Sequence, residues 1–478
     1  MQIFNTASRS KEEFIPIRPG KVHMYVCGVT VYDLCHIGHA RSALVFDVLV
    51  RFLRSKGLDV TFVRNFTDVD DKIIRRANTE NKDWKEIAET YINAFHEDMD
   101  ALGIQRADFE PRATENIQNI ISICQTLVDQ GTAYATPSGD VYFSVRAFPA
   151  YGKLSHRDID DMLSGARVAP GEEKRDPLDF AIWKAAKSGE PYWESPWGKG
   201  RPGWHIECST MSLKYLGETF DFHGGGSDLI FPHHENEIAQ SQCCCENYHS
   251  FAQYWLHNGF ITIDNEKMSK SLNNFITVPD ILKQYPGEVV RFFILRTHYR
   301  SPLDFSEERI REAQAGLLRL KNAYDLGNEL LNRTGNTEAH TELADIATKA
   351  MADFQEAMDD DFNTALAIGY MFTLSKEINV YANNVINKGA EYDAVHFRKL
   401  MDVYGEMAGI IGIFESSLDM PVSDGDGISP AEIEALIEER AEAKKAKNWA
   451  RADEIRDSLK EQGILLEDSA AGTKWKKA

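Results

Sequence analysis

The sequence predicts an α/β fold built on a doubly wound parallel sheet that is split by an insertion. A strand-like run at 22–27 is followed by a helical pattern and by a second strand-like run at 60–66. This βαβ order is typical of parallel sheets. The order breaks in a turn-rich stretch at 133–203, and strand character returns at 219–223. From residue 306 onward the apolar spacing becomes helical, which predicts a helical bundle and a small C-terminal domain.

The length of 478 residues suggests about three domains, at roughly 150 residues each. A segment rich in Pro, Gly and Asp near 421–427 has the composition of a linker, and the residues after it read as a small, charged helical appendage. The predicted boundaries are as follows: first half of the core 1–132, inserted connective domain 133–203, second half of the core 204–305, helical bundle 306–420, linker and small domain 421–478.

The charge balance restricts the partners that the chain can attract. The chain has 53 Lys and Arg against 74 Asp and Glu, a net charge of -21, which argues against broad nonspecific binding to nucleic acid. A local reversal occurs at 440–478, with ten basic and seven acidic residues. No apolar run reaches the roughly 18 residues of a membrane span, and the first residues lack a signal-peptide pattern. We therefore expect a cytoplasmic protein with no membrane contact.

The seven cysteines are an odd number without the paired spacing of a disulfide framework. Free thiols or metal ligands are therefore expected. The run Cys243-Cys244-Cys245 is read as a helix segment with small side chains, because neighbouring residues on a helix diverge by about 100° and cannot easily share one ion.

The first strand–helix junction is a candidate phosphate site, which makes the predicted sheet a nucleotide-binding core. The strand breaks at Gly28, and apolar residues four apart, from Leu44, predict a helix that begins just after His39. Backbone N–H groups and the imidazoles of His36 and His39 would then face the space above a strand end, where a polyphosphate could bind. The alternative is a capped turn with two exposed histidines.

A second candidate phosphate site is Lys267-Met268-Ser269-Lys270-Ser271, a loop in which two lysines flank hydroxyl residues. Such a loop can fold over a triphosphate and neutralise the charge that develops on a departing pyrophosphate. Taken alone, the segment is better explained as a solvated surface loop.

Together, His36-Ile37-Gly38-His39 and the lysine loop are the paired signature of class I aminoacyl-tRNA synthetases. Within that class the chain resembles the cysteinyl-tRNA synthetase family over nearly its whole length. The stretches that carry this resemblance are 24–28, 64–68, 203–208 and 223–237. One departure is Asn273, just after the lysine loop, where the family usually has Gly. Asn tolerates left-handed backbone better than most residues, so the turn can form. The departure therefore puts only the mobility of the lysine loop in question.

The resemblance implies one Zn²⁺ per chain, held by Cys27, Cys208, His233 and Glu237. On a helix, His233 and Glu237 would share one face, whereas spacing alone would not join Cys27 to Cys208. Without the resemblance, Cys208 would read as an ordinary buried thiol. A zinc-protease helix beginning at His234-Glu235 fails, because the residue three after the Glu is Ile238 rather than His.

The resemblance also implies that the substrate thiolate joins this zinc. Soft zinc favours sulfur and lowers the pKa of a thiol, which separates cysteine from serine without an editing site. Four protein ligands usually mark a closed site, so this role requires either an enlarged coordination shell or a loosely held Glu237.

Further residues are placed by the same resemblance. Thr67, Trp204 and His223 are expected around the amino acid, with the alternatives of a strand-end hydroxyl, a core indole and a capped loop histidine. Asp228, after the Gly224-Gly225-Gly226 run, is positioned to accept from ribose hydroxyls. The set expected to bind ATP is Gly28, His36, Gly38, His39, Asp228, Lys267 and Lys270.

The implied reaction is the ATP-dependent ligation of L-cysteine to tRNA(Cys) through a cysteinyl-adenylate. His36, His39, Lys267 and Lys270 are the expected catalytic residues, with Mg²⁺ accompanying ATP. The basic segment around Trp449 suits an exposed anticodon, and a packed tryptophan on an amphipathic helix is the alternative. We expect a monomer. The competing functions are a ligase that passes cysteine to an amino sugar and a nonenzymatic, zinc-containing RNA-binding protein.

Overall fold

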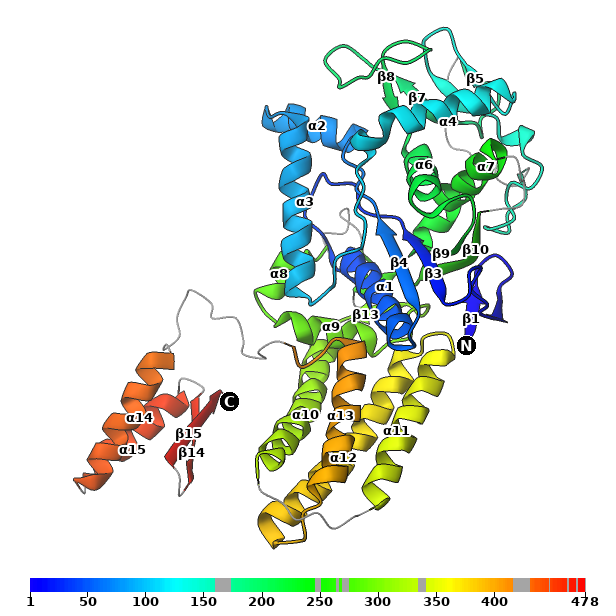
Figure 1. Cartoon of the computed structure of the whole chain (residues 1–478). Coiled ribbons are helices and arrows are strands. Elements are labelled where there is room, and N and C mark those ends of the chain that lie inside the picture. Colours follow the sequence, from blue (N-terminus) through cyan, green and yellow to red (C-terminus); the bar gives the residue numbers. More distant parts are fainter. Residues whose placement is uncertain are drawn as a thin grey trace. The chain divides into compact units, whose positions relative to one another are not determined.

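The computed structural model divides the chain into two compact units, Met1–Leu418 and Asp419–Ala478, which are described separately (Figure 1). The residues that the structure describes are 1–159, 173–245, 251–263, 266–268, 275–333, 341–415, 430–446, 448–461, 464–469 and 472–477.

A parallel four-stranded sheet forms the centre of the first unit, in the order β10-β9-β3-β4. The strands are β3 (Lys21–Val26), β4 (Asp59–Arg64), β9 (Phe220–Gly226) and β10 (Ala252–Asn258). Helix α1 (Ile37–Ser55) connects β3 to β4. The doubly wound α/β class predicted from the sequence is confirmed.

Alternating side chains of these strands bury the two faces of the sheet against different helices. Met24 and Phe222 pack in the same core cluster as the apolar face of α1. Their neighbours Tyr25 and Trp255 pack on the opposite side with Cys208, on helix α6 (Trp204–Leu216). Because all four strands run in parallel, their carboxyl ends meet at one edge, and residues following β3, β4 and β9 gather there.

One detail of the sequence prediction was wrong: the three glycines expected to follow a strand lie within β9 itself. A Cβ on Gly224 would lie 2.2 Å from the ring of Phe46. The glycine therefore does not form a turn. Its missing side chain lets α1 pack closely on the strand.

The remaining elements of the core and the insertion surround this sheet. Strands β5 to β8 form an antiparallel sheet in chain order, and they fall within the region read as an insertion. The bounds are β1 (Gln2–Asn5), β2 (Ser10–Glu13), α2 (Asp71–Glu80), α3 (Trp84–Ala101), η1 (Ala113–Asn116), α4 (Ile117–Asp129), β5 (Ala133–Ala135), β6 (Val141–Phe143), η2 (Val145–Ala147), β7 (Phe180–Ala185), β8 (Gly200–Pro202), η3 (Ser227–Leu229), η4 (Ile230–His234) and α7 (Glu235–Cys244).

A small sheet in the order β12-β11-β13 precedes the bundle of α10 to α13, which hangs below the core in Figure 1. A buried ion pair links the core to the elements near the bundle: Arg291 Nη2 lies 2.5 Å from Asp47 Oδ2, and Arg291 Nε donates to Ile411 O. The bounds are β11 (Ile261–Ile263), β12 (Glu266–Lys267), α8 (Val278–Leu282), α9 (Gly287–Leu295), β13 (Leu303–Phe305), α10 (Glu307–Leu331), α11 (Thr341–Asp359), α12 (Thr364–Lys388) and α13 (Ala394–Ile411).

The second unit combines helices α14 (Pro430–Lys445) and α15 (Trp449–Glu461) with an antiparallel hairpin, β14 (Ile464–Ser469) and β15 (Gly472–Lys477). The expectation of a purely helical appendage was therefore wrong. Ile464 packs with Ile433 and Leu459 of the two helices, so the hairpin completes their core. In the described parts of the chain, no helix has the length and apolarity needed to cross a membrane.

Candidate active site and metal centre

Four side chains at the carboxyl edge of the central sheet converge on one point. One ligand atom each from Cys27, Cys208, His233 and Glu237 lies within 4.8 Å of every other. The Sγ atoms of Cys27 and Cys208 are 3.6 Å apart, and Glu237 Oε1 lies 3.2 Å from Cys27 Sγ and 3.0 Å from His233 Nε2. The set that the resemblance implied is therefore brought together.

Each of these side chains owes its place to a separate element. Cys27 directly follows β3, and its N–H donates to Gly224 O of the neighbouring strand. Cys208 lies in the second turn of α6. His233 lies in the π-helical turn η4 and Glu237 in α7. The non-helical residue of this segment is Phe231, which precedes His233, so the four-residue spacing places His233 and Glu237 on one side.

Burial and mutual contact set the charge of this cluster. Burial disfavours a charged Glu237, but His223 and His233 outweigh it and hold the pKa of that carboxyl well below its usual range. Burial lowers the pKa of His233, but the Glu237 carboxylate raises it more, to about 10. Burial raises the pKa of the Cys208 thiol, yet the hydrogen bonds from Cys27 and His233 bring it to about 6. These contacts lower the pKa of the Cys208 thiol and of the Glu237 carboxyl, which favours their anionic forms.

The donor set fits zinc. Two thiols, one imidazole and one carboxylate are ligand types that Zn²⁺ takes in four-coordinate sites. His223 Nε2 lies 2.9 Å from Glu237 Oε2, which leaves the other oxygen of this buried carboxylate facing the cysteines. His205 Nδ1 similarly contacts His233 Nδ1 at 2.9 Å. Such outer contacts orient ligands in metal sites.

A second, overlapping group also meets the geometric condition for a metal: Cys27, His223, His234 and Glu237. One nitrogen of each of its histidines has a contact, His223 Nε2 with Glu237 Oε2 and His234 Nδ1 with His257 Nε2 at 2.8 Å, whereas His223 Nδ1 and His234 Nε2 are buried with no hydrogen-bond partner among the described residues. The first group contains both sulfur atoms, and sulfur is the donor that zinc favours.

The three residues expected around the amino acid border this cluster in different ways. The Trp204 ring packs on His233, with ring centroids 4.2 Å apart, and 38% of its surface is exposed. Thr67 Oγ1 lies 2.7 Å from Glu207 Oε2 and is buried. His223 contacts a proposed metal ligand rather than open space. Of the three, Trp204 alone combines solvent exposure with contact to the cluster.

His36 and His39 cap helix α1, which begins at Ile37, three residues earlier than the apolar pattern indicated. His36 Nδ1 accepts from Gly38 N at 3.0 Å, and His39 Nδ1 accepts from His36 N at 3.3 Å. The two rings stack with centroids 3.6 Å apart. A Cβ on Gly38 would lie 2.7 Å from the His36 ring, so this arrangement requires glycine.

The segments on either side of the lysine loop lie against this histidine motif. At the start of the loop, Met268 Cε would lie 3.6 Å from a Cβ on Gly38. After it, Ile276 O accepts from Ile37 N at 3.1 Å, and Val278 N donates to Cys35 O at 2.7 Å. The two signature motifs, remote in sequence, are therefore neighbours. Lys267 has its backbone in β12, whereas Lys270 and Asn273 lie outside the described residues.

Gly28 and Asp228 also lie at this edge. The N–H of Gly28 donates to Asn65 Oδ1 at 2.9 Å. A Cβ on this residue would lie 1.6 Å from Asn65 O, so the close approach requires glycine. The Asp228 carboxylate folds back over Gly226, where a Cβ would lie 2.4 Å from Oδ1. Asp228 is exposed, so its carboxylate can accept hydrogen bonds from a bound molecule.

The sequence reasoning missed three polar residues of this region: His205, His257 and Asn65. His257 Nδ1 contacts Thr6 Oγ1 at 2.8 Å, which extends the buried contacts of His234 towards the N-terminal hairpin. In the register of β9 and β10, His223 lies opposite Trp255 and His257 opposite Gly225, and the sequence carries no signal that fixes this register.

The central sheet is parallel, and its first helix begins with the stacked rings of His36 and His39. The start of this helix is hydrogen-bonded to the segment that follows the lysine loop. Together these features define a class I aminoacyl-tRNA synthetase core. Solved structures agree on the fold: the chain resembles the Mycobacterium tuberculosis methionyl-tRNA synthetase in complex with methionyl-adenylate, with a TM-score of 0.59, 16% identity and coverage of 82% of this chain and 90% of that chain. A putative arginyl-tRNA synthetase from Campylobacter jejuni matches with a TM-score of 0.56, 11% identity and coverage of 84% and 94%.

Sequence comparison narrows the class further. Residues 13–315 match the family model "tRNA synthetases class I (C) catalytic domain", 353–415 match the DALR domain, and 428–475 match the cysteinyl-tRNA ligase anticodon binding domain. The cysteine–tRNA ligase of Desulfovibrio desulfuricans is 54% identical, with 99% of each chain covered, and that of Geobacter sulfurreducens is 53% identical, with 100% of this chain and 99% of the relative covered. The chain belongs to the cysteine–tRNA ligase family.

Proposed function

We propose that the chain ligates L-cysteine to tRNA(Cys) in two steps, through a cysteinyl-adenylate formed from ATP and Mg²⁺, with one Zn²⁺ selecting the substrate thiol. The observation that carries this proposal is the convergence of Cys27, Cys208, His233 and Glu237 at the sheet edge that also carries His36. The run from Cys27 to His36 joins the two groups directly, which supports a shared site for the amino acid and ATP.

In this proposal the metal supplies a soft Lewis acid that binds sulfur as thiolate, which a serine hydroxyl cannot match. The chain's own part is to hold the ligands in place. Glu237 is buried and contacted on both oxygens, by His223 and by His233 and Cys27. These contacts favour an enlarged coordination shell over a loosely held Glu237.

The activation step needs positioning and electrostatics rather than proton transfer. The substrate carboxylate attacks the α-phosphate of ATP in line, the bond to the β-phosphate breaks, and negative charge moves to the leaving pyrophosphate. His36, His39, Lys267 and Lys270 would bind that charge. The stacked, mutually capped imidazoles support this role, because their orientation is established before ATP arrives.

The second step transfers the cysteinyl group to a ribose hydroxyl of the terminal adenosine of tRNA, with release of AMP. The bundle α10–α13 and the second unit support an RNA acceptor over an amino sugar, since a small acceptor would need neither. Trp449 is 60% exposed, which favours base stacking over the alternative of a packed indole. We further propose that the chain works as a cytoplasmic monomer.

The test is cysteine-dependent ATP–pyrophosphate exchange combined with metal analysis. The wild type should exchange with cysteine and not with serine, and it should carry about one zinc per chain. Cys208→Ser should lose both the zinc and the discrimination against serine. Cys124→Ser is the matched control, because Cys124 is buried in the insertion core and contacts only Ile182 O by hydrogen bonding among the described residues.

The possible outcomes separate the two parts of the proposal. Absence of cysteine-dependent exchange in the wild type would overturn the ligase and favour a nonenzymatic RNA-binding protein. Full zinc content and full selectivity in Cys208→Ser would overturn the role of the metal and leave the ligase standing.

A further inference from the structure

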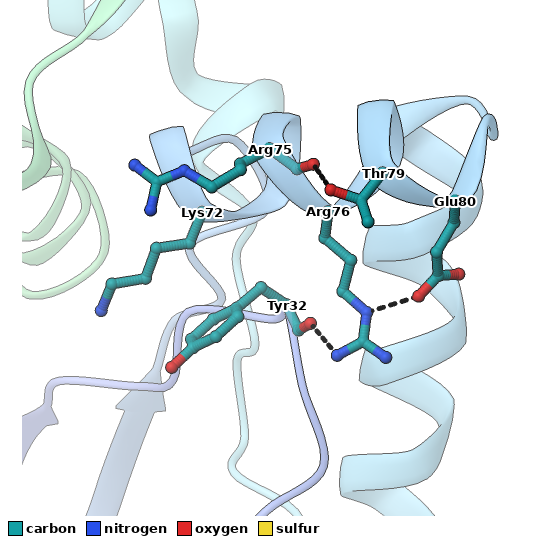
Figure 2. Close-up of a pocket in the computed structure, with 6 residues that line it drawn as sticks. All are labelled: Tyr32, Lys72, Arg75, Arg76, Thr79 and Glu80. Atoms are coloured by element: carbon teal, nitrogen blue, oxygen red, sulfur yellow. Dashed lines mark hydrogen bonds and ion pairs between the residues drawn. The ribbon is translucent and has the colours of Figure 1, made fainter. Parts of the chain in front are cut away.

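A basic hollow is lined mainly by residues of helix α2 (Figure 2). It encloses about 400 Å³, which is in the range that holds a nucleotide-sized group. The residues that line it are Tyr32, Lys72, Arg75, Arg76, Thr79 and Glu80.

The charge of this hollow opposes that of the whole chain. Its lining contains three cations and one carboxylate, a balance of +2, on a chain whose net charge is -21. The cations are grouped because Lys72, Arg75 and Arg76 follow the three- and four-residue spacing that places side chains on one face of a helix. A local positive surface on an acidic protein attracts anions selectively to that place.

The three cations have different roles. Arg76 is held by its neighbours, at 2.9 Å from Asp33 Oδ1, 2.7 Å from Glu80 Oε1 and 3.1 Å from Tyr32 O. Lys72 and Arg75 have no carboxylate within 4.0 Å among the residues that the structure describes. Both are exposed, and Figure 2 shows them reaching to the same side, away from the pair formed by Arg76 and Glu80. Two cations thus remain available to a ligand, and the third fixes the wall.

The position of the hollow connects the nucleotide site with the insertion. Tyr32 also lines a smaller cavity that contains His36, His39 and Phe275. At the other end, Asp71, next to Lys72, forms ion pairs with Lys184 and Arg201 of the inserted sheet. An anion in the hollow would therefore lie between the histidine motif and the insertion.

We propose that this hollow binds backbone phosphates of the single-stranded 3′ end of tRNA, with Lys72 and Arg75 as the phosphate contacts. The inference rests on the proposed function, in which the 3′ ribose must reach the adenylate. A flexible strand with one charge per nucleotide fits two cations on neighbouring helical positions. The ammonium of Lys72 lies 5.1 Å from the centroid of the Tyr32 ring, which orients it towards the nucleotide side.

The test is the double variant Lys72→Ala/Arg75→Ala, assayed for both steps of the reaction. KM for tRNA in aminoacylation should rise at least tenfold, while ATP–pyrophosphate exchange, which needs no tRNA, should change less than twofold. The slope of log affinity against log salt should fall by about 1.4, at about 0.7 per lost single-strand contact. Lys72→Arg/Arg75→Lys should keep KM within about threefold, because the charges remain.

The control is Lys21→Ala, which removes an exposed cation at the start of β3, at the amino end of the central sheet. It should leave KM for tRNA unchanged. A tRNA trimmed of its single-stranded 3′ nucleotides should bind the wild type and the double variant equally. An unchanged KM for intact tRNA, or equal losses with intact and trimmed tRNA, would overturn this inference. Loss of exchange in the double variant would instead assign the hollow to ATP.

Discussion

Replacing Gly38 with alanine tests whether the orientation of the histidine pair contributes to catalysis. The new Cβ would lie 2.7 Å from Cε1 and 2.8 Å from Nδ1 of His36. Non-bonded atoms of this kind prefer about 3.5–4.0 Å, so the ring must move by about 1 Å. It has little freedom to do so, because it stacks on His39 and accepts from Gly38 N.

The expected loss of rate follows from this displacement. A misplacement of about 1 Å at a reacting centre can cost about 100-fold, or about 2.7 kcal/mol. The folding cost should be smaller: losing the cap costs about 1 kcal/mol, and alanine in a helix returns part of it. Cysteine-dependent exchange should therefore fall about 100-fold while the thermal midpoint changes by a few degrees at most.

Gly369→Ala is the matched control, because Gly369 is an exposed residue within α12 and a Cβ there would meet nothing within 4 Å. This variant should keep full exchange and gain about 0.5–1 kcal/mol of stability. Wild-type exchange in Gly38→Ala would refute the reasoning, since the ring would then have moved without consequence for the reaction.

Three further predictions concern stability and RNA binding. Asp47→Ala should lower the free energy of unfolding by about 3–5 kcal/mol, seen in urea titration, because it leaves Arg291 buried and unpaired; a loss below about 1 kcal/mol would contradict this. Burial raises the pKa of Asp98 to about 7, so stability is lost as the pH rises from about 4 to about 7, where the unfolded chain ionises this group more readily than the folded one, and the loss is constant above that range. Asp98→Asn should therefore stabilise the chain more at pH 8 than at pH 5, and an equal effect at both pH values would count against it. Trp449→Ala should raise KM for tRNA about tenfold if the exposed indole stacks on a base, and an unchanged KM would exclude that contact.

The sequence predicted those parts of the fold that depend on local periodicity. The helical spacing that starts at residue 306 matches the start of α10 closely, because one apolar face per helix is visible within a single window. The glycines of β9 and the C-terminal hairpin were assigned wrongly. Position 224 requires glycine because the ring of Phe46, which is distant in sequence, occupies the space that a side chain would need. No local pattern contains that contact.

In the candidate site, too, local spacing was predicted from the sequence, whereas contacts between distant elements were not. The four-residue spacing of His233 and Glu237 is local, and the two side chains meet although one lies in η4 and the other in α7. Cys27 and Cys208 meet only because β3 and α6 pack face to face, so family resemblance was required to pair them. The contacts of His205 and His257 also run between elements, which is why sequence reasoning passed over them.

X-ray absorption at the zinc edge, with and without cysteine, tests the central claim most directly. The account predicts zinc with two sulfur ligands at about 2.3 Å in the protein alone, from Cys27 and Cys208, and a third sulfur when cysteine is added. Serine should leave the spectrum unchanged. A sulfur count that stays at two in the presence of saturating cysteine would contradict the claim that the metal recognises the substrate.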